Sequence, residues 1–313
     1  MNDLLRSRLA AQYGALAVSD AYACGYTRLS LSRVVSTGEL IRVRTGAFVD
    51  ARLHAEATPE GRHALSAQAI ARSFDGRHAV SHQSAVAVLG LPLLSADFGV
   101  THLSRRSPGD QRSAQGLWIH RHLAPGCTRM VAGVAVVHPA IAVVQAAAVM
   151  GVKVGVAAAD AALAAGRITK EELERALRIS RVGPGRADAR TTVELADGLA
   201  ESRGESWARV LFVSLGLPKP ELQVEIRDER GDLVGRVDFL FRAQRTIVEF
   251  DGLVRYGGAD GRQALIAEKR REDSLRALGF QMVRPTWRDL YDPPRLGQAI
   301  RAAFARAADF EAS

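Results

Sequence analysis

Residues 235–252 read Gly235-Arg236-Val237-Asp238-Phe239-Leu240-Phe241, then Arg242-Ala243-Gln244-Arg245, then Thr246-Ile247-Val248-Glu249-Phe250-Asp251-Gly252. The outer segments are rich in β-branched and aromatic residues and alternate as strands do, which predicts an antiparallel hairpin. If residues 242–245 form the loop, the register places Asp238 opposite Glu249. Directly opposed residues have Cβ atoms roughly 4.5–5.5 Å apart. Two carboxylates that close repel each other unless a proton or a cation lies between them, and we expect a divalent metal ion.

The composition is that of an ordinary globular protein, because 47% of the 313 residues are hydrophobic and 24% are charged. The formal net charge is +8, from 42 Lys and Arg against 34 Asp and Glu, and the pI is about 10.0. This balance favours a polyanionic partner, so we expect nucleic acid, with double-stranded DNA preferred. Basicity without a functional meaning is the alternative. The sequence contains no Gly-x-x-x-x-Gly-Lys-Ser/Thr motif, so ATP-driven translocation is not expected.

The cysteine content and the apolar segments bear on the expected location of the protein. Cys24 and Cys127 lie far apart in the sequence, which indicates neither a disulfide framework nor a cysteine-based zinc site. Residues 1–8 lack the basic-then-apolar layout of a signal peptide, and the apolar region 131–166 is interrupted by polar residues. We therefore expect a cytoplasmic protein without a membrane partner. The oligomeric state stays open, with a homodimer as one alternative.

The first 55 residues alternate short helical patterns with turn signals. Helices are expected around residues 4–9, 18–24 and 27–37, followed by a small hairpin over residues 40–49. Three helices and a hairpin are typical of a winged helix-turn-helix. The candidate contacts to DNA phosphates are Arg28 and Arg33 on the third helix and Arg42 and Arg44 on the hairpin. The alternative is a small helical capping domain whose arginines form a solvated face.

Residues 56–182 predict an α+β middle domain. Helices are expected over residues 59–74, 81–89, 140–165 and 170–179, and strands over 98–103, 117–122 and 134–138.

A His-x-His pair lies in the middle domain. Trp118, His120 and His122 share one face of a predicted strand, and such a pair can ligate zinc. No third ligand is expected nearby, so ordinary surface or core histidines are the preferred interpretation. The segment 181–186 reads Arg-Val-Gly-Pro-Gly-Arg and is the clearest linker, which places a domain boundary there.

The C-terminal domain, residues 187–313, has the predicted element order α-β-β-β-α-β. Ser202 and Glu205 have the spacing of a capping box at the start of a helix. For Glu205, capping alone and a role in the site are both open. Gly252 is expected to permit a close backbone approach or a positive φ at the end of its strand.

Asp238 and Glu249 are separated by ten residues, and Asp251 follows Glu249 on the same face. This pattern resembles the PD-(D/E)XK nuclease superfamily, and more closely the bacterial DUF559-type proteins related to very-short-patch repair endonucleases. The resemblance covers about the last 110 residues. The matching segments are Gly204-Glu205, Gly216-Leu217-Pro218, Gly235 to Asp238, Val248 to Gly252, Glu268 to Asp273, Leu275 to Phe280, Val283-Arg284 and Thr286-Trp287.

The N-terminal portion more faintly resembles the antitoxin domain of AbiEi-type toxin–antitoxin systems. With both resemblances, the predicted fold class is a multidomain α+β or α/β chain. It would contain an N-terminal winged helix-turn-helix, an α+β middle region and a C-terminal restriction-endonuclease-like mixed sheet flanked by helices.

The nuclease resemblance implies a chemistry for the hairpin. In that superfamily a hard cation, usually Mg²⁺ and alternatively Mn²⁺, binds an Asp and a Glu from adjacent strands, orients water and offsets charge on the scissile phosphate. Carried over by motif, Asp238 and Glu249 are metal ligands, and Glu205 is a helix carboxylate that can approach the same ion.

Asp251 departs from the superfamily pattern, which usually has lysine at this position to position water and stabilise developing negative charge. The register places Asp251 opposite Arg236, so an ion pair is one interpretation. The missing cation would then come from the following helix, where Arg271 faces inward and Lys269 is a more exposed candidate. Arg271 as the structural partner of a carboxylate is an equally open alternative.

Three functions follow from these patterns. The first is a DNA-binding protein with a metal-dependent endonuclease domain that hydrolyses phosphodiester bonds. The second is a catalytically inactive, antitoxin-like transcriptional repressor, which Asp251 in place of lysine favours. The third is an RNA-processing nuclease, because hydrolysis of either backbone would use the same carboxylates.

Overall fold

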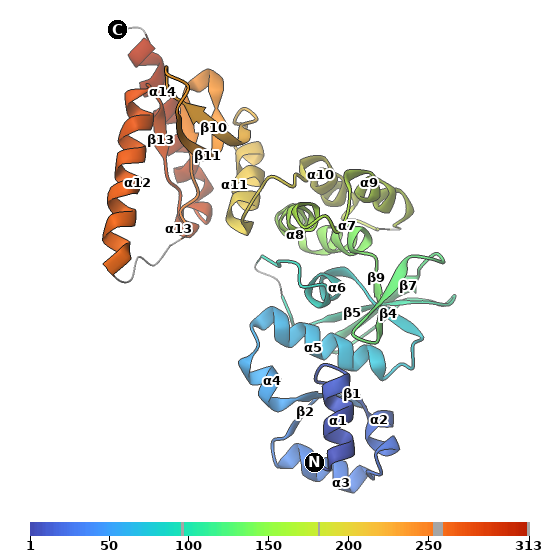
Figure 1. The fold of residues 1–313 in the computed structure, drawn as a ribbon. Coiled ribbons are helices and arrows are strands. Elements are labelled where there is room, and N and C mark those ends of the chain that lie inside the picture. Colours follow the sequence, from blue (N-terminus) through green and yellow to red (C-terminus); the bar gives the residue numbers. More distant parts are fainter. Residues whose placement is uncertain (95–96, 181, 253–258, 312–313) are drawn as a thin grey trace. The chain divides into compact units, whose positions relative to one another are not determined.

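The protein divides into two compact units, Met1–Ala196 and Asp197–Ser313, and its described residues form three sheets in a mixed α/β fold (Figure 1). The structure is a computed structural model that describes residues 1–94, 97–180, 182–252 and 259–311. Arg181, the first residue of the predicted linker, lies outside the described residues.

The first unit begins with short helices and a small antiparallel sheet in the strand order β1-β3-β2. Side chains at the helix starts satisfy backbone N–H groups, because Asn2 accepts from Leu5 N and Thr27 from Ser30 N. The three predicted helices and the hairpin are present, and the strand β1 was not predicted. The elements are α1 (Asp3–Ala11), β1 (Ala15–Ala17), α2 (Val18–Ala23), α3 (Arg28–Ser36), β2 (Leu40–Arg44) and β3 (Ala47–Asp50).

A six-stranded mixed sheet with the order β6-β7-β5-β4-β9-β8 forms the centre of the first unit. The strands β5 and β7 are parallel neighbours, although the chain between them also forms β6. The elements of this part are α4 (Ala51–Glu56), α5 (Pro59–Arg72), β4 (His78–Val80), α6 (His82–Val88), β5 (Thr101–Arg105), β6 (Arg112–Ala114), β7 (Leu117–His122), β8 (Thr128–Val131) and β9 (Val134–Val137).

One buried apolar cluster joins the small sheet to the large one. It contains Ala47 and Val49 of β3 together with Val80 of β4 and Val136 of β9. The helix α5 supports this continuity, because it contacts β1 and β3 as well as β4 and β5. The predicted segments 1–55 and 56–182 therefore form one compact unit.

Four helices complete the first unit. The predicted helix over residues 140–165 is two helices, because Gly151 adopts φ 87° between them. The fourth, α10, contacts α7, α8 and α9. The second unit consequently starts at Asp197 and not at residue 187. These helices are α7 (Pro139–Met150), α8 (Val152–Ala164), α9 (Lys170–Ile179) and α10 (Arg186–Leu195).

The second unit is built on a mixed sheet in the order β10-β11-β12-β13, with the last pair parallel. Phe212 packs edge-on against Phe239 and Phe241, and Leu275 is fully buried in a cluster with strand residues. The elements are α11 (Arg203–Ser214), β10 (Glu221–Arg227), β11 (Leu233–Phe241), the 3₁₀ turn η1 (Arg242–Gln244), β12 (Thr246–Val248), α12 (Ala259–Ala277), β13 (Gln281–Val283), α13 (Trp287–Leu290) and α14 (Pro293–Glu311).

The register of the hairpin over residues 235–252 agrees with the prediction from the sequence. The strands β11 and β12 pair Phe241 with Thr246 and Phe239 with Val248. Extended by one step, this register would bring Asp238 opposite Glu249, which directly follows the end of β12. The hairpin loop closes through Arg245 in the left-handed conformation at φ 43°.

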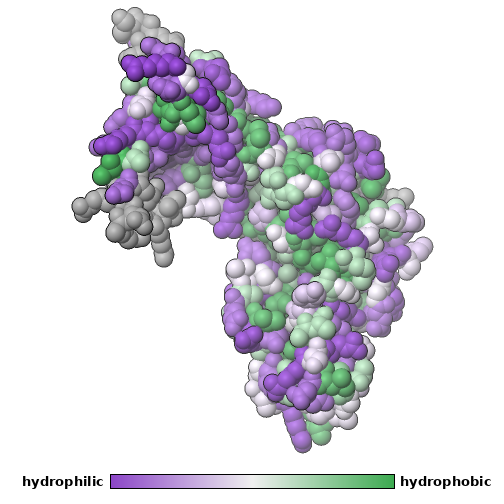
Figure 2. Space-filling model, in the orientation of Figure 1, coloured by the Kyte–Doolittle hydropathy of each residue, from purple (hydrophilic) through white to green (hydrophobic). Residues whose placement is uncertain are grey.

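Hydrophilic residues cover much of the surface of each unit in the view of Figure 2. None of the helices in the described ranges combines the length and apolar character needed to cross a membrane.

Candidate functional site

Asp238 lies at the point where β11 continues past the end of β12. Its carboxylate accepts a hydrogen bond from the backbone N–H of Phe250 at 2.9 Å, and Gln223 Nε2 lies 3.5 Å from its other oxygen. Gln223 belongs to the neighbouring strand β10 and adopts φ 50°. The same amide donates to Glu205 Oε2 at 3.0 Å. One glutamine therefore joins two of the three predicted carboxylates.

Glu205 lies in the first turn of α11 and is 7% exposed. Ser202 Oγ accepts from Glu205 N at 3.1 Å, which is one half of the predicted capping box. In the other half of a capping box the Glu205 carboxylate would accept from the backbone N–H of Ser202. In this protein it accepts from Glu201 N at 3.0 Å. Glu205 thus holds the chain before the helix and also contacts Gln223 of the sheet.

The environment of Asp238 favours its protonated form. Burial is the largest cause and raises its pKa to about 6, with further contributions from the negative charges of Glu205 and Glu249. The hydrogen bonds from Phe250 and Gln223 act in the opposite direction. Acidic groups that repel one another in a half-buried position are relieved by a proton or by a cation.

Glu249 is held by arginines. Arg271 of α12 donates to its two carboxylate oxygens at 2.8 and 2.7 Å, and Arg284 donates at 3.1 Å. Both arginines also contact Glu268. Hydrogen bonds from Arg271 are the largest cause that lowers the pKa of Glu268, to about 2. The inward orientation predicted for Arg271 is confirmed, and its partners are Glu249 and Glu268.

The other predicted residues on this side of the unit are more exposed. Asp251 is exposed, and its backbone N–H donates to Pro285 O at 2.9 Å. Arg236 contacts Glu201 at 2.5 Å, and the ion pair between Arg236 and Asp251 stays a prediction. Lys269 is exposed on α12, as the sequence indicates.

The close backbone approach lies at Gly204 and not at Gly252. A Cβ at Gly204 would lie 2.1 Å from the ring of Phe250, whereas at Gly252 its contact with that ring would be an ordinary 3.6 Å. Gly252 also lacks a positive φ. The expectation for Gly252 was wrong. The position without room for a side chain is Gly204, where α11 meets the ring of Phe250.

The N-terminal arginines differ in their surroundings. Arg28 and Arg33 are exposed on α3, and Arg42 is exposed on β2. Arg44 is half-buried and donates to the carbonyl oxygen of Gln115 at 2.8 Å. The first three are therefore available to a phosphate backbone, whereas Arg44 already has a partner.

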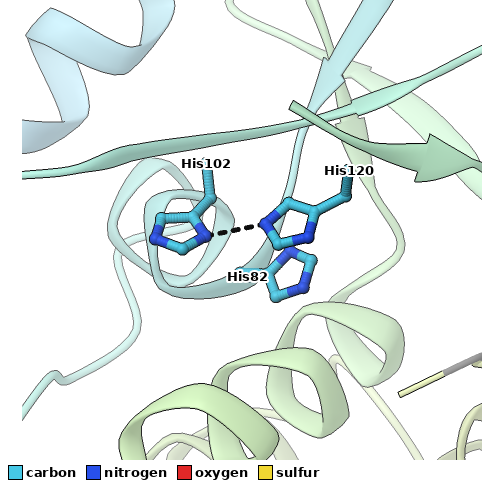
Figure 3. A group of neighbouring side chains, drawn as sticks. All are labelled: His82, His102 and His120. Carbon is cyan, nitrogen blue, oxygen red and sulfur yellow. Dashed lines mark hydrogen bonds between the residues drawn. The ribbon is translucent and has the colours of Figure 1, made fainter. Parts of the chain in front are cut away.

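The first unit contains a histidine cluster that sequence reasoning did not assemble. His82, His102 and His120 place one ring nitrogen each within 4.8 Å of the others, and in the described ranges no other set of His, Cys, Asp or Glu does so. Figure 3 shows His102 and His120 joined by a hydrogen bond of 2.8 Å, with the His82 ring beneath them. The expectation that His120 has no nearby third ligand was wrong. His122, its predicted strand partner, is exposed and outside the cluster.

Burial lowers the pKa of each of the three histidines. The pKa falls well below its ordinary value for His82, to about 3 for His102 and to about 4 for His120. All three imidazoles are consequently neutral at physiological pH.

Sequence reasoning also missed Gln223 and Arg284. The strand register offers a signal for Gln223, because its neighbours Leu222 and Val224 pair with Phe239 and Val237 on either side of Asp238. Arg284 directly follows β13, which is the parallel neighbour of β12. A polar residue where two parallel strands end together is therefore the signal for Arg284.

No family model matches the chain. Two curated relatives from Mycobacterium tuberculosis, named "Uncharacterized protein Rv2248" (strain ATCC 25618 / H37Rv) and "Uncharacterized protein MT2308" (strain CDC 1551 / Oshkosh), are each 30% identical to it over 286 residues. Each alignment covers 90% of this chain and 98% of the relative. The chain belongs to the same protein family as these mycobacterial proteins.

Proposed function

We propose that the protein binds double-stranded DNA and hydrolyses phosphodiester bonds with Mg²⁺ or Mn²⁺ held by Glu205 and Asp238. The observation that carries the proposal is the arrangement of these carboxylates around Gln223, where Asp238 has a pKa of about 6. Carboxylate oxygens are donors that hard cations prefer, and Mg²⁺ commonly uses one or two carboxylates and keeps its waters. The donor set therefore fits the ion that the nuclease resemblance implies.

Glu249 fits the role of metal ligand less well than Glu205 and Asp238. Its two oxygens accept from Arg271 and Arg284, so binding a metal ion would require these hydrogen bonds to be released. We assign Glu249 to positioning the two arginines.

The residues around Asp238 have different roles in the proposed reaction. The bound cation would act as a Lewis acid toward the scissile phosphate and its attacking water. Phe250 N–H fixes one oxygen of Asp238, and Gln223 holds Glu205 beside it. The guanidinium of Arg271 on α12 is paired with Glu249 and Glu268.

The order of elements in residues 1–50 supports a winged helix-turn-helix as the DNA-binding part. In that arrangement α3 would approach the DNA and the β2–β3 hairpin would be the wing. Exposed Arg28, Arg33 and Arg42 lie on these elements and would neutralise phosphates.

The test is cleavage of a mixed pool of supercoiled, nicked, mismatched and single-stranded DNA and of RNA, with Mg²⁺ or Mn²⁺ supplied. Wild-type protein and Asp232→Asn, which removes an exposed acid from the β10–β11 turn, should cleave DNA. Asp238→Asn and Glu205→Gln should not. Cleavage of RNA alone would select the RNA-processing alternative, and cleavage that persists in Asp238→Asn would refute the assignment of the site.

A non-enzymatic DNA-binding regulator is the second candidate. Asp251 lies where the superfamily usually has lysine, so the missing cation would have to come from a neighbouring arginine. The observation that favours this candidate is that Arg271 and Arg284 are already paired with Glu249 and Glu268. Binding of promoter DNA that is equal in wild type and Asp238→Asn, with no cleavage by either, would select this candidate.

A further inference from the structure

We infer that His82, His102 and His120 form a binding site for a divalent transition-metal ion of the zinc class, with the fourth coordination position left to water. This site lies in the first unit and uses nitrogen ligands, so it is separate from the carboxylates of the second unit. A test of the histidine site therefore gives no result for or against the proposed nuclease site.

The three histidines come from separate parts of the fold. His102 lies on β5 and His120 on the parallel neighbour β7, where the register offsets them by two residues. His82 begins α6 and adopts φ 54°, in the left-handed region that a residue with a side chain seldom occupies. The tertiary fold therefore holds His82 against the two strands, and its ring stacks on His120 with centroids 3.6 Å apart (Figure 3).

The spacing of the ring nitrogens suits a metal ion. Zn–N distances of about 2.0–2.1 Å place the nitrogens of a tetrahedral site roughly 3.4 Å apart. In the protein, His102 Nδ1 and His120 Nε2 are 2.8 Å apart, and the three ligand nitrogens all lie within 4.8 Å of one another. An ion at this place would replace the hydrogen bond between His102 and His120, and the stacked rings of His82 and His120 would have to turn toward it.

Burial and neighbouring hydroxyl groups prepare the ligands. His82 is 7% exposed and His102 is 3% exposed, so the rings are kept in the neutral form that binds metals. Ser81 Oγ lies 3.0 Å from His82 Nδ1, and a partner on a ring nitrogen orients histidine ligands in metal sites. Ser84 Oγ accepts from the backbone N–H of His102 at 2.9 Å, which fixes the strand at this residue.

Three protein ligands are the number found in zinc sites that keep an open position. No cysteine or carboxylate joins the cluster among the residues that the structure describes. The half-buried His120 and the partly exposed Trp118, whose ring stacks on His120 at 5.2 Å, lie on the more accessible side. Water is accordingly the expected fourth ligand.

The test is calorimetric titration of Zn²⁺ into the full-length, metal-free protein with excess Mg²⁺ present to saturate carboxylate sites. Wild type should bind one Zn²⁺ per chain. Variants His102→Gln, His120→Gln and His82→Asn should lose this binding, with asparagine chosen because it tolerates the left-handed conformation at position 82. The control His122→Ala removes an exposed histidine from the same strand and should bind as wild type does.

Co²⁺ provides a second measurement that depends on coordination. Wild type and His122→Ala should develop the visible d–d absorption of a four-coordinate Co²⁺ site. Circular dichroism should confirm that the variants without this absorption are folded. Absence of Zn²⁺ binding by wild type would overturn the inference whatever the variants do. Binding that persists in all three ligand variants, or that is lost in His122→Ala, would also overturn it.

Discussion

Arg271 donates a hydrogen bond to each oxygen of the Glu249 carboxylate, at 2.8 and 2.7 Å. The side chains of the two residues are 23% and 13% exposed. The second of the two hairpin carboxylates is therefore neutralised by an arginine of α12, whereas Asp238 has no comparable cationic partner among the causes of its pKa shift. This difference separates the structural part of the site from the part that we assign to a cation.

Replacement of Arg271 should destabilise the second unit. Arg271→Ala leaves Glu249 and Glu268 with Arg284 alone, and we expect a loss of about 2–3 kcal/mol in the free energy of unfolding. That is less than for a fully buried pair, because both side chains retain contact with water. Arg276→Ala on the same helix removes the pair between exposed Arg276 and half-buried Glu272 and should cost less than about 1 kcal/mol. Urea unfolding of both variants checks the difference.

The Arg271→Ala effect should depend on pH through Glu268. The pKa of Glu268 is lowered from 4.5 to about 2 in the folded protein, chiefly by its hydrogen bonds to Arg271. A lowered pKa contributes stability above the pKa of the unfolded chain and loses that contribution as the pH falls toward the folded value. The stability difference between wild type and variant should thus be full at pH 6 and shrink between pH 4.5 and about 2. A difference that grows over this range would contradict the assignment.

Asp238 should show the opposite pH dependence. Its pKa is raised from 3.8 to about 6, so the folded protein retains a proton that the unfolded chain has lost. Ionisation of Asp238 therefore costs stability as the pH rises through this range. Without divalent cations, Asp238→Asn should be more stable than wild type by about 1–3 kcal/mol at pH 8 and equal to it below pH 4.

Unfolding of the second unit can be followed separately to check this prediction. Trp207 and Trp287 lie in the second unit and Trp118 in the first, so a Trp118→Phe background reports on the second unit alone. Asp232→Asn is the matched control and should follow wild type at both pH values. No gain for Asp238→Asn at pH 8 would argue against strain between the carboxylates.

The approach of Phe250 to α11 should tolerate no side chain at position 204. In Gly204→Ala the new Cβ would lie 2.1 Å from the Phe250 ring, and we expect destabilisation of about 1–3 kcal/mol. Gly252→Ala, where the contact would be 3.6 Å, should change stability by less than about 0.5 kcal/mol. Thermal unfolding distinguishes the two, and equal effects would show that Phe250 does not constrain position 204.

DNA binding through the N-terminal arginines should be visible in its salt dependence. Replacing Arg28, Arg33 and Arg42 by glutamine should weaken binding to duplexes of any sequence. The slope of log K against log salt should fall by roughly 1 for each arginine that contacts phosphate. Fluorescence anisotropy across a salt series measures this slope.

A control triple variant separates local contacts from overall charge. Arg52, Arg175 and Arg178 are exposed on α4 and α9, so their replacement by glutamine changes the net charge equally. This variant should retain the wild-type slope. Equal weakening by the two triple variants would mean that overall charge, and not α3 and the hairpin, provides the affinity.

Local sequence signals predicted most of the elements, because strong caps and short turns determine them. The pattern at Thr27 predicted α3, and the polar break after Phe241 predicted the hairpin register. The start of the second unit was missed, since whether α10 packs on α7 and α8 depends on tertiary contacts that periodicity does not report.

The site was predictable only in part for the same reason. Asp238 and Glu249 are related by the register of one hairpin, which a sequence can indicate. The pairing of Arg284 with Glu249 depends on a parallel strand that follows a long helix. The histidine cluster requires β5 and β7 to be neighbours and His82 to adopt a strained backbone, neither of which the local pattern encodes.

Calorimetric titration of Mg²⁺ into wild type, Asp232→Asn, Asp238→Asn and Glu205→Gln decides whether Glu205 and Asp238 hold the cation. Wild type and Asp232→Asn should each bind one Mg²⁺ per chain, and Asp238→Asn and Glu205→Gln should bind none. At pH 6 about half a proton per ion should be released, because the pKa of Asp238 is about 6 before the cation binds. Equal binding by all four proteins, or no binding by wild type, would contradict the assignment of Glu205 and Asp238 as the metal ligands.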